Sequence, residues 1–288
     1  MKKGWRNNYI DKLSWFEVLG KDLKFYIKDL IKRFKNNGRL PVIVTYPDFP
    51  SKRTTIFKIA DQLNFRITNK LVADARVFLF FEDQTHSVLP TTFASLSNRI
   101  LNDKVLDISK KKVDHVHLEV FGYNTIIDPT TFKGKAVRKS DKNALHDGEV
   151  IDCPIESSDP NSVYQIVIDN SFDAHHVVDF RVPVIAGEIP LCYKKFKEYK
   201  VRFTNDVSSS TLHSPKEIFS DTELIMISDF ANKFELDFGE LDVLRHSDGK
   251  IYIIDVNKTP YGPPFGLALE DKEKAVSMLT ASFKKNFL

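Results

Sequence analysis

Three oxygen-bearing side chains lie at the ends of two short apolar segments. Asp255 and Asn257 follow the run Ile251–Ile254, and Asp242 interrupts an apolar run on the other side of the turn at 246–249. Asp255 and Asn257 point the same way, because residues two apart share one face of a strand. If the two runs pair as an antiparallel hairpin, Asp242 converges on them.

The chemistry that such a group could do is cation binding. Carboxylates gathered at one place repel each other unless a cation neutralises them. Mg²⁺ prefers a few carboxylates together with phosphate oxygens, and Mn²⁺ accepts similar ligands. The pattern therefore predicts that Asp242, Asp255 and Asn257 hold magnesium (or manganese) beside a phosphate group. The other interpretation is that these side chains only cap neighbouring turns, which Asp and Asn favour.

Any phosphate site in this chain must use side-chain cations. The sequence has neither the Walker A pattern nor G-x-G-x-x-G, so it lacks a glycine-rich backbone cradle. Lys104 and Lys139 are suitable point charges, although each by itself is more typical of a solvated surface lysine. Arg181 and Arg202 are the arginines that we favour for the site, because a guanidinium clamps a carboxylate or phosphate with two bonds.

The elements that must position these residues alternate between helices and strands. Helical spacing extends over Lys21–Lys35 and Lys52–Leu63, and Leu40–Thr45 and Arg76–Phe81 have the composition of buried strands. Their order along the chain is the signature of a βαβ layer.

Beyond residue 100, strands dominate. Helices are predicted over Lys104–Val116, Thr222–Glu235 and Asp271–Phe283. The predicted strands are Arg99–Asn102, Lys135–Lys139, Val163–Ile168, Phe180–Ile185, Leu191–Phe196, Val201–Phe203, Leu241–Arg245 and Ile251–Ile254. The expected fold class is therefore α/β.

Composition places the chain among ordinary globular proteins. Of its 288 residues 42% are hydrophobic and 28% are charged, and the net charge of +3 is too small to argue for nucleic-acid binding. Cys153 and Cys192 stand in no zinc-binding spacing, and a chain of this size needs no disulfide framework. The sequence shows no signal-peptide h-region and no apolar run of about 18 residues. We therefore expect a cytoplasmic protein without a membrane span.

The segment from Asp242 to Pro260 resembles the metal-binding end of the ATP-grasp superfamily. In that family an acidic residue, then a Glu or Asp, then an Asn two residues later hold magnesium against the phosphates of ATP. The usual second residue is Glu, and the shorter Asp255 takes its place here. The resemblance thus implies ATP and Mg²⁺ (or Mn²⁺) as cofactors, with Asp242, Asp255 and Asn257 as the metal ligands.

Upstream segments resemble nucleotide-binding motifs of the same family, in the order that the family requires. Asn102–Lys104 is similar to its helix-opening DK motif, whose lysine reaches the nucleotide phosphates, and Lys139 takes the place of the second phosphate lysine. Val163–Val167 resembles the hinge strand that binds adenine through its backbone. The resemblance implies that this role falls to Gln165, Ile166 and Val167, although many relatives have Glu where Gln165 stands.

Two further segments resemble the family's D-x-R-V strand and R-x-N segment. These are Asp179–Val182 and Arg202–Asn205. The resemblance implies that Arg181, Arg202 and Asn205 are catalytic residues, which stabilise the transferred phosphoryl group or the acid substrate.

The resemblance covers about residues 100–265 and implies a domain organisation. It implies an ATP-grasp fold, in which ATP lies between two α+β lobes, preceded by an N-terminal Rossmann-like pre-ATP-grasp domain. The expected division is an N-terminal domain over residues 1–100, a central lobe over 101–170 and a C-terminal lobe with the metal site over 171–288.

The activity that the resemblance implies is ATP- and Mg-dependent ligation. In this family a substrate carboxylate attacks ATP to give an acyl phosphate, and an amine or similar nucleophile then displaces phosphate, which forms a carbon–nitrogen bond in the amine case. The implied partners are a small-molecule or peptide carboxylate and a nucleophilic acceptor. The identity of both stays open, as does the oligomeric state, for which a homodimer is one option.

Three alternatives remain. A kinase of the same fold would phosphorylate a hydroxyl of a small molecule or sugar. A regulatory protein would bind nucleotide with little turnover. A nucleic-acid-binding protein would use the basic and aromatic stretch Lys194–Arg202 as a stacking platform, and its affinity would fall steeply with salt.

Overall fold

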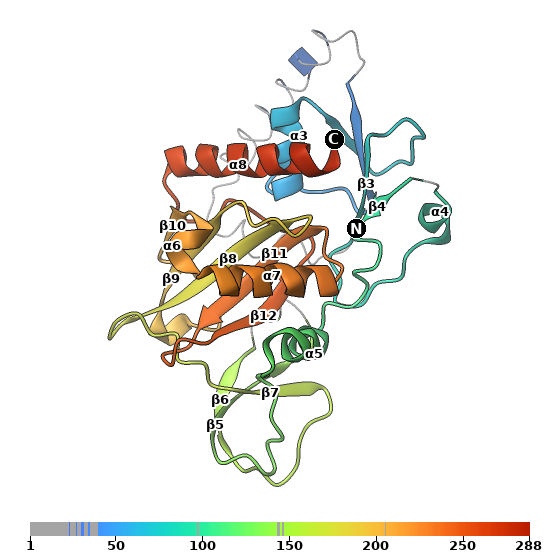
Figure 1. Ribbon diagram of the computed structural model, residues 1–288. Coiled ribbons are helices and arrows are strands. Elements are labelled where there is room, and N and C mark those ends of the chain that lie inside the picture. Colours follow the sequence, from blue (N-terminus) through green and yellow to red (C-terminus); the bar gives the residue numbers. More distant parts are fainter. Residues whose placement is uncertain are drawn as a thin grey trace.

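The computed structural model describes residues 40–96, 98–142, 145, 147–204 and 206–288, together with positions 23, 27, 30, 31 and 34. Those five positions are helical and fall within the helix predicted over Lys21–Lys35, the rest of which lies outside the described residues. The described chain is a mixed α/β structure in which the strands form three sheets with helices packed on them (Figure 1).

The first sheet has four parallel strands in the order β2-β1-β3-β4. Its elements are β1 (Val42–Pro47), α3 (Thr55–Leu63), β2 (Arg66–Thr68), β3 (Val77–Phe81), α4 (Thr91–Ala94) and β4 (Ile100–Leu101). The runs VIVTYP and VFLFF are almost continuously apolar, as strands buried on both faces of a parallel sheet are. The predicted βαβ layer is therefore present, with β2 as an additional strand.

The second sheet has three antiparallel strands in the order β6-β5-β7. They are β5 (Gly134–Ser140), β6 (Glu149–Cys153) and β7 (Ser162–Ile166). Figure 1 shows this sheet below the five-stranded sheet, on the side of α5. The position of Lys139 on β5 is as predicted.

Helix α5 spans Lys110–Phe121 and so begins later than the predicted helix over Lys104–Val116. Its N-cap is Ser109, whose hydroxyl accepts a 3.2 Å hydrogen bond from the backbone N of Lys112. Residues 102–104 instead form a turn, in which Asn102 has a φ of 60°. The predicted start is wrong because Val105 and Ile108, between this turn and Ser109, are buried without being helical. Their spacing of three is also that of an apolar helix face.

The third sheet has five antiparallel strands in the order β10-β9-β8-β11-β12. They are β8 (His176–Ile185), β9 (Cys192–Glu198), β10 (Ser209–His213), β11 (Phe238–Arg245) and β12 (Ile251–Asn257). The predicted strand Val201–Phe203 is wrong. A 3₁₀ turn at Tyr199–Val201 begins there, and the backbone N of Thr204 bonds to the carbonyl of Val201 at 2.9 Å, so β10 forms the sheet edge instead.

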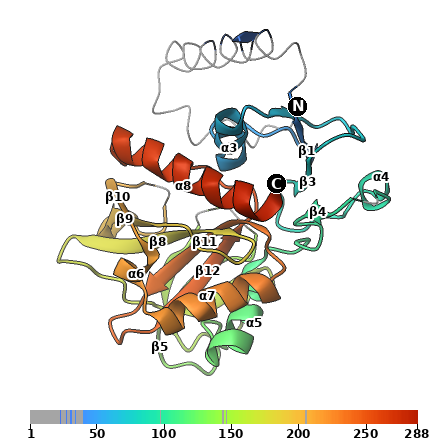
Figure 2. The same cartoon turned by 45° about the horizontal axis from the view of Figure 1, so that its top comes forward.

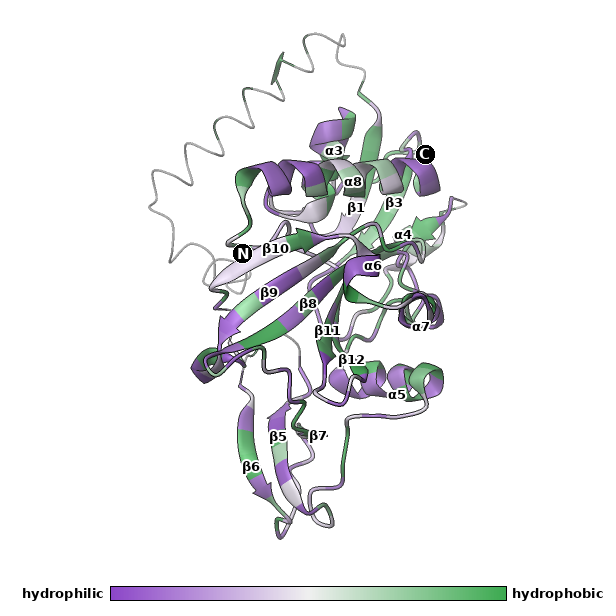
Figure 3. Ribbon diagram, turned by 60° about the vertical axis from the view of Figure 1, so that its left-hand side comes forward, coloured by the Kyte–Doolittle hydropathy of each residue, from purple (hydrophilic) through white to green (hydrophobic). Residues whose placement is uncertain are grey.

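The five-stranded sheet has one apolar face and one charged face. Helix α7 (Asp221–Lys233) and helix α5 pack on the apolar face, where Val182, Leu241 and Val243 are fully buried (Figure 2). Alternate residues point the other way, and purple and green segments alternate along β8 and β9 in Figure 3. The period of two therefore places Asp179 and Arg181 of β8 and Lys195 and Lys197 of β9 on the face away from α7.

The first sheet shares part of its core with helix α8 (Leu269–Phe287) at the far end of the described chain. Ile43 and Leu79 of the sheet belong to one buried cluster with Ile59 of α3 and with Leu279 and Phe283 of α8. Figure 2 shows α8 between α3 and the five-stranded sheet. The second and third sheets each fall within one expected segment, while β4 of the first sheet crosses the expected boundary after residue 100. The last segment completes the core of the first sheet, and the division into domains stays a prediction.

Two further findings concern disulfide bonds and membrane-spanning helices. Cys153 and Cys192 are free thiols, so these two residues form no disulfide with each other. In the part of the chain that the structure describes, no helix is both long enough and apolar enough to cross a bilayer.

Candidate metal and nucleotide site

Strands β11 and β12 place Asp242 and Asp255 directly opposite each other. Their Cα positions are partners in the antiparallel register, and so are those of Glu240 and Asn257. The register shifts just after Asp242, which makes Ile254 an extra residue on β12. Two adjacent cross-strand pairs of oxygen-bearing side chains therefore lie on the charged face. The predicted convergence of Asp242 with Asp255 is present, whereas Glu240 was not predicted.

Two basic side chains hold Asp242. Lys195 Nζ lies 3.0 Å from Oδ1 of Asp242, and Arg181 Nε lies 3.2 Å from the same oxygen. Burial alone would raise the pKa of Asp242, but the charges of Lys195 and Arg181 outweigh burial and hold the pKa well below its usual range. Asp242 is therefore ionised at neutral pH. Arg181 stands where the sequence predicted, while Lys195 could not be singled out from the neighbouring lysines of β9.

Asp255 is in the opposite electrostatic situation. Burial and then the charge of Asp242 raise the pKa of Asp255 to about 6, against the lowering effect of Lys110 and Lys139. At neutral pH two carboxylates thus face each other across the strand pair, and among the described residues only Asp242 has ion-pair partners at hydrogen-bond distance. A divalent cation at this place would relieve their repulsion.

Two lysines from outside the five-stranded sheet interact with Asp255. Lys139 is half-buried on β5, where burial and then the charge of Lys110 lower its pKa to about 8 and the charge of Asp255 opposes that change. Lys110 is the first residue of α5, and its Nζ bonds to the carbonyl of Lys142 at 2.8 Å. Burial lowers the pKa of Lys110, and Asp255 is the largest opposing charge. These two lysines therefore supply positive charge on the side of Asp255.

Lys104, in contrast, is not brought to the carboxylates. Its side chain is 65% exposed, and its Nζ lies 2.7 Å from Oε1 of Glu235. Glu235 follows the end of α7, which packs on the apolar face of the sheet. The residue that opens the helix is Lys110, and sequence reasoning missed it because the predicted helix began too early.

The predicted adenine hinge lies at the end of β7. The backbone N of Ile166 donates to the carbonyl of Thr125 at 2.8 Å, and the buried Gln165 side chain donates to the hydroxyl of Thr125. Asp114 accepts from the backbone N of Thr125 at 2.6 Å and fixes this segment in turn. The side chain of Gln165 therefore holds the hinge in place, and Val167 is half-buried beside it.

An apolar cluster adjoins the hinge. It joins β11 and β12 to the residues around the end of β7, and its members are Ile168, Leu244 and Tyr252, with Ile166, Ile254 and Tyr123 packed against them. The apolar core of the five-stranded sheet thus continues to the end of β7.

Arg202 lies at the hinge and not beside Asp242. One of its Nη atoms donates to the carbonyl of Ile168 at 2.7 Å and to the side-chain oxygen of Asn170 at 2.9 Å. Asn170 also donates to Asp179, so Arg202 is linked to the charged face only through a chain of hydrogen bonds. Asn205, the third residue predicted to be catalytic, lies outside the described residues.

The residues present fit magnesium. Asp242 and Asp255 offer two carboxylates. The side-chain oxygen of Asn257 accepts from the backbone N of Thr259 at 2.9 Å and, at the longer distance of 3.5 Å, from its hydroxyl. In the described ranges there is no group of three or more His, Cys, Asp or Glu side chains arranged to hold an ion. An incomplete oxygen set of this kind suits Mg²⁺, which takes its remaining ligands from phosphate and water.

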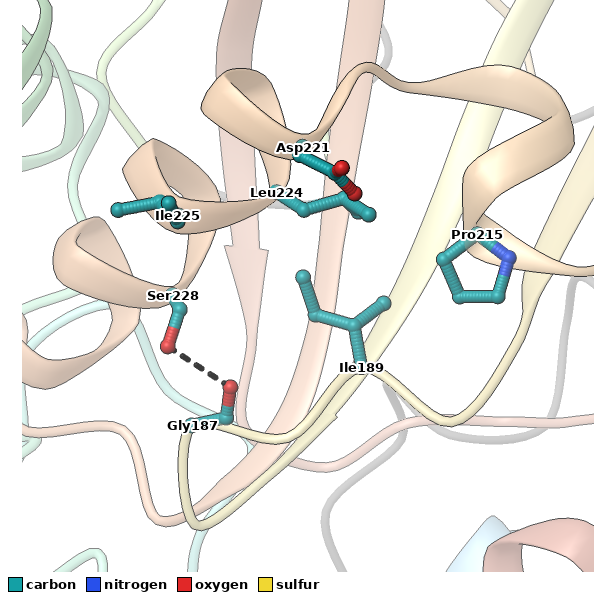
Figure 4. Close-up of a pocket in the computed structure, with 7 residues that line it drawn as sticks. All are labelled: Gly187, Ile189, Pro215, Asp221, Leu224, Ile225 and Ser228. Atoms are coloured by element: carbon teal, nitrogen blue, oxygen red, sulfur yellow. Dashed lines mark hydrogen bonds between the residues drawn. The ribbon is translucent and has the colours of Figure 1, made fainter.

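A separate surface depression lies away from these residues. It is lined by Gly187, Ile189, Pro215, Asp221, Leu224, Ile225 and Ser228 (Figure 4). The hydroxyl of Ser228 donates to the carbonyl of Gly187 at 2.9 Å, and the remaining lining is mostly apolar. It contains none of the predicted site residues and none of their partners.

Comparison of structures finds ATP-grasp ligases, the superfamily that the sequence resembles. One is the ATP-grasp ligase PsnB complexed with precursor peptide PsnA2 and AMPPNP, with a TM-score of 0.49 and 11% identity over 87% of this chain and 99% of that chain. Another is the macrocyclase MdnC bound with precursor peptide MdnA from Microcystis aeruginosa MRC, with a TM-score of 0.48 and 10% identity over 86% of this chain and 99% of that chain.

Other similar structures match less of this chain. The L-amino acid ligase from Bacillus licheniformis has a TM-score of 0.44 and 13% identity over 77% of this chain and 67% of that chain. In PsnB complexed with minimal precursor, the match spans about half of that protein, 52% of its length. No family model and no curated protein matches the sequence. The role of each residue in this chain therefore rests on the geometry described above.

Proposed function

We propose that this chain is an ATP- and magnesium-dependent ligase, which activates a carboxylate as an acyl phosphate for attack by an amine or similar nucleophile. The observation that carries the proposal is the in-register pair of Asp242 and Asp255, with Arg181 and Lys195 on one side and Lys110 and Lys139 on the other. Two carboxylates thus lie next to each other on the charged face, with basic side chains near each of them. That arrangement suits a triphosphate bound through a divalent ion.

Each group has a distinct role in this proposal. Asp242, Asp255 and Asn257 hold magnesium, which, when bound, neutralises charge on the phosphate oxygens. Lys110 and Lys139 bind phosphate from the side of the second sheet. Arg181 and Lys195, released in part from Asp242 when that carboxylate also holds an ion, face the phosphoryl group being transferred. The backbone beyond Ile166 and the adjoining apolar cluster accommodate adenine.

No side-chain nucleophile is needed in such a reaction. The substrate carboxylate supplies the attacking oxygen, and the chain supplies positioning and fixed positive charge. In this proposal the acid lies near the parallel sheet, where the start of α3 meets the loop after β12. The backbone N of Thr55 bonds there to the carbonyl of Pro260 at 2.9 Å. Amino acids and short peptides are the first acids to try.

The test uses hydroxylamine as a small nucleophile in place of the unidentified acceptor. The full chain is incubated with ATP, Mg²⁺ and hydroxylamine, and with each member of a panel of free amino acids and short peptides. A ligase yields ADP, phosphate and a hydroxamate of the acid that it activates. Asp255→Asn is the matched control, because it keeps the shape of the side chain and removes its charge.

The outcomes separate the proposal from its alternatives. Hydroxamate formation that depends on Mg²⁺ and is lost in Asp255→Asn supports the ligase. A phosphorylated hydroxyl compound with ADP but no hydroxamate identifies a kinase. Tight binding of nucleotide without turnover across the panel, or binding of nucleic acid that is indifferent to Asp255→Asn, contradicts the proposal.

A further inference from the structure

Glu240 is a buried carboxylate on the charged face of β11. Its side chain is 1% exposed, and neither of its oxygens has a hydrogen-bond partner among the described residues. It stands two residues before Asp242, so both side chains share one face of the strand. Burying a carboxylate without hydrogen bonds is costly, which calls for a compensating interaction.

That interaction is with Arg181. The Nε atom of Arg181 lies 3.2 Å from Oδ1 of Asp242 and 3.5 Å from Oε2 of Glu240. Two carboxylates on one strand therefore face the same edge of one guanidinium. A guanidinium carries five N–H donors in a planar fork, and only one of them is on Nε, so these two contacts leave the four donors on the Nη atoms unused.

Residues outside the five-stranded sheet also pack against the carboxylate of Glu240. A Cβ on Gly262 would lie 3.2 Å from Oε1 of Glu240 and 2.8 Å from Oγ1 of Thr55, so the backbone of Gly262 packs closely on the carboxylate. Lys58 of α3 donates to the carbonyl of Gly262 and interacts electrostatically with Glu240. The carboxylate is thus kept in contact with Arg181 by packing against the loop that follows β12.

We infer that Glu240 is a positioning residue, which orients Arg181 so that its Nη groups face the terminal phosphate of the bound nucleotide. The inference rests on the proposed function. Asp242 alone is a poor anchor for Arg181, because its Oδ1 is already shared with Lys195 and, in the proposed function, its carboxylate also holds a metal ion. Glu240 lies roughly 7 Å further along the strand, at two residues of rise, and keeps its contact with Arg181 when Asp242 is engaged.

The test compares two magnesium-bound nucleotides that differ by one phosphate. Calorimetry on the full chain gives the Kd of Mg·ADP and of Mg·AMP-PNP, and the ratio of the two reports contacts to the third phosphate. Glu240→Gln is expected to reduce the preference for AMP-PNP about tenfold, the effect of one charge-assisted contact, with Mg·ADP binding changed less than about twofold. Arg181→Ala should reduce the preference for AMP-PNP at least as much. In a chain that carries Arg181→Ala, adding Glu240→Gln should cause no further loss of this preference.

A matched control is Glu223→Gln, which breaks a similar pair at the other end of β11, where Arg245 Nη1 lies 2.6 Å from Oε1 of Glu223. It should leave the preference unchanged. If Glu240→Gln does not fold, Glu240→Asp keeps the charge but withdraws the oxygens from Arg181, and the same loss of preference is expected.

Three results would overturn the inference. In the first, both Glu240 variants keep the preference while Arg181→Ala loses it. In the second, Glu240→Gln weakens both nucleotides equally, which is the effect of a purely structural carboxylate. In the third, Arg181→Ala keeps the preference. If the unaltered chain binds neither nucleotide, the proposed function itself fails, a result that cannot be confused with these three.

Discussion

Asp242 and Asp255 are partners in the register of β11 and β12, yet their pKa values move in opposite directions. Lys195 and Arg181 stabilise the charge on Asp242, while burial and the charge of Asp242 itself work against ionisation of Asp255. The strand pair therefore stores a repulsion that a divalent ion can relieve. This difference between the two carboxylates leads to predictions that need no knowledge of the acid substrate.

Neutralising the two carboxylates should affect stability with opposite signs. Asp242→Asn leaves Lys195 and Arg181 without their counter-charge and should lower the free energy of unfolding by about 3 kcal/mol. Asp255→Asn removes the repulsion and should raise it by about 1 kcal/mol. Urea unfolding at pH 7 without divalent ions measures both. A similar destabilisation by the two variants would show that the carboxylates are electrostatically equivalent.

The raised pKa of Asp255 predicts a stability that depends on pH. The native group binds its proton below about pH 6, whereas its ordinary value is 3.8, so the native state gains stability as the pH falls from about 7 toward 4. Asp242 acts in the opposite sense, since its pKa is lowered from 3.8, and stability from its ionised form is lost only below that value. Between pH 4 and 8, Asp255→Asn should lose this contribution to the unfolding midpoint but not the whole pH dependence. Burial raises the pKa of Glu240 to about 7, which acts in the same direction, and lowers the pKa of His117 to about 4, which acts in the opposite direction.

The same proton competes with the metal ion. Mg²⁺ requires the ionised carboxylate, so the affinity for Mg·ADP should increase as the pH rises through about 6 and should level off above pH 7. Calorimetry in matched buffers measures this dependence. Glu217 has a lowered pKa and lies away from the site, so Glu217→Gln should leave the profile unchanged. A flat profile would show that Asp255 is no ligand.

Lys110 and Lys104 form a matched pair for testing the phosphate site. Lys110→Ala removes a cation that interacts with Asp255 and should weaken Mg·ADP binding about tenfold or more. Lys104→Ala removes only an exposed ion pair with Glu235 and should change binding less than about twofold. The reverse order would restore the assignment that the Asn102–Lys104 motif suggested.

Arg202 and Arg181 should differ in the part of the nucleotide that they affect. Arg202 bonds to the carbonyl of Ile168 at the hinge, so Arg202→Ala should weaken Mg·ADP and Mg·AMP-PNP by the same factor, about tenfold. Arg181→Ala should weaken mainly Mg·AMP-PNP. Loss of selectivity for AMP-PNP in Arg202→Ala would instead place this arginine at the terminal phosphate, as its motif predicted.

The pairing of Asp242 with Asp255 was the most predictable part of the candidate site. Alternation along a strand placed Asp255 and Asn257 on one face, and the turn at 246–249 required Asp242 to lie on the adjacent strand. Both inferences depend on local periodicity alone. Lys139 lies on β5, as the strand prediction placed it, and its role as a phosphate lysine stays a prediction.

Residues that depend on tertiary packing were not predictable. Lys110 was missed because the start of α5 is decided by the Ser109 cap, while the apolar residues before it are buried in a turn. Glu240 was missed because an acidic residue in a strand is normally exposed, and only the fold shows that Arg181 and Gly262 enclose it. The strand predicted at Val201–Phe203 is wrong because a 3₁₀ turn begins at Tyr199, and the side chain of Arg202 bonds to the carbonyl of Ile168.

The cluster that joins Ile43 and Leu79 to Leu279 and Phe283 has a consequence for biosynthesis. The first sheet can form its strand pairs early, but one of its apolar sides stays uncovered until α8 has left the ribosome. Contacts between segments so distant in the chain form slowly and expose apolar surface in the meantime. During translation the nascent chain should therefore need a chaperone over this surface, and release of α8 should end that need.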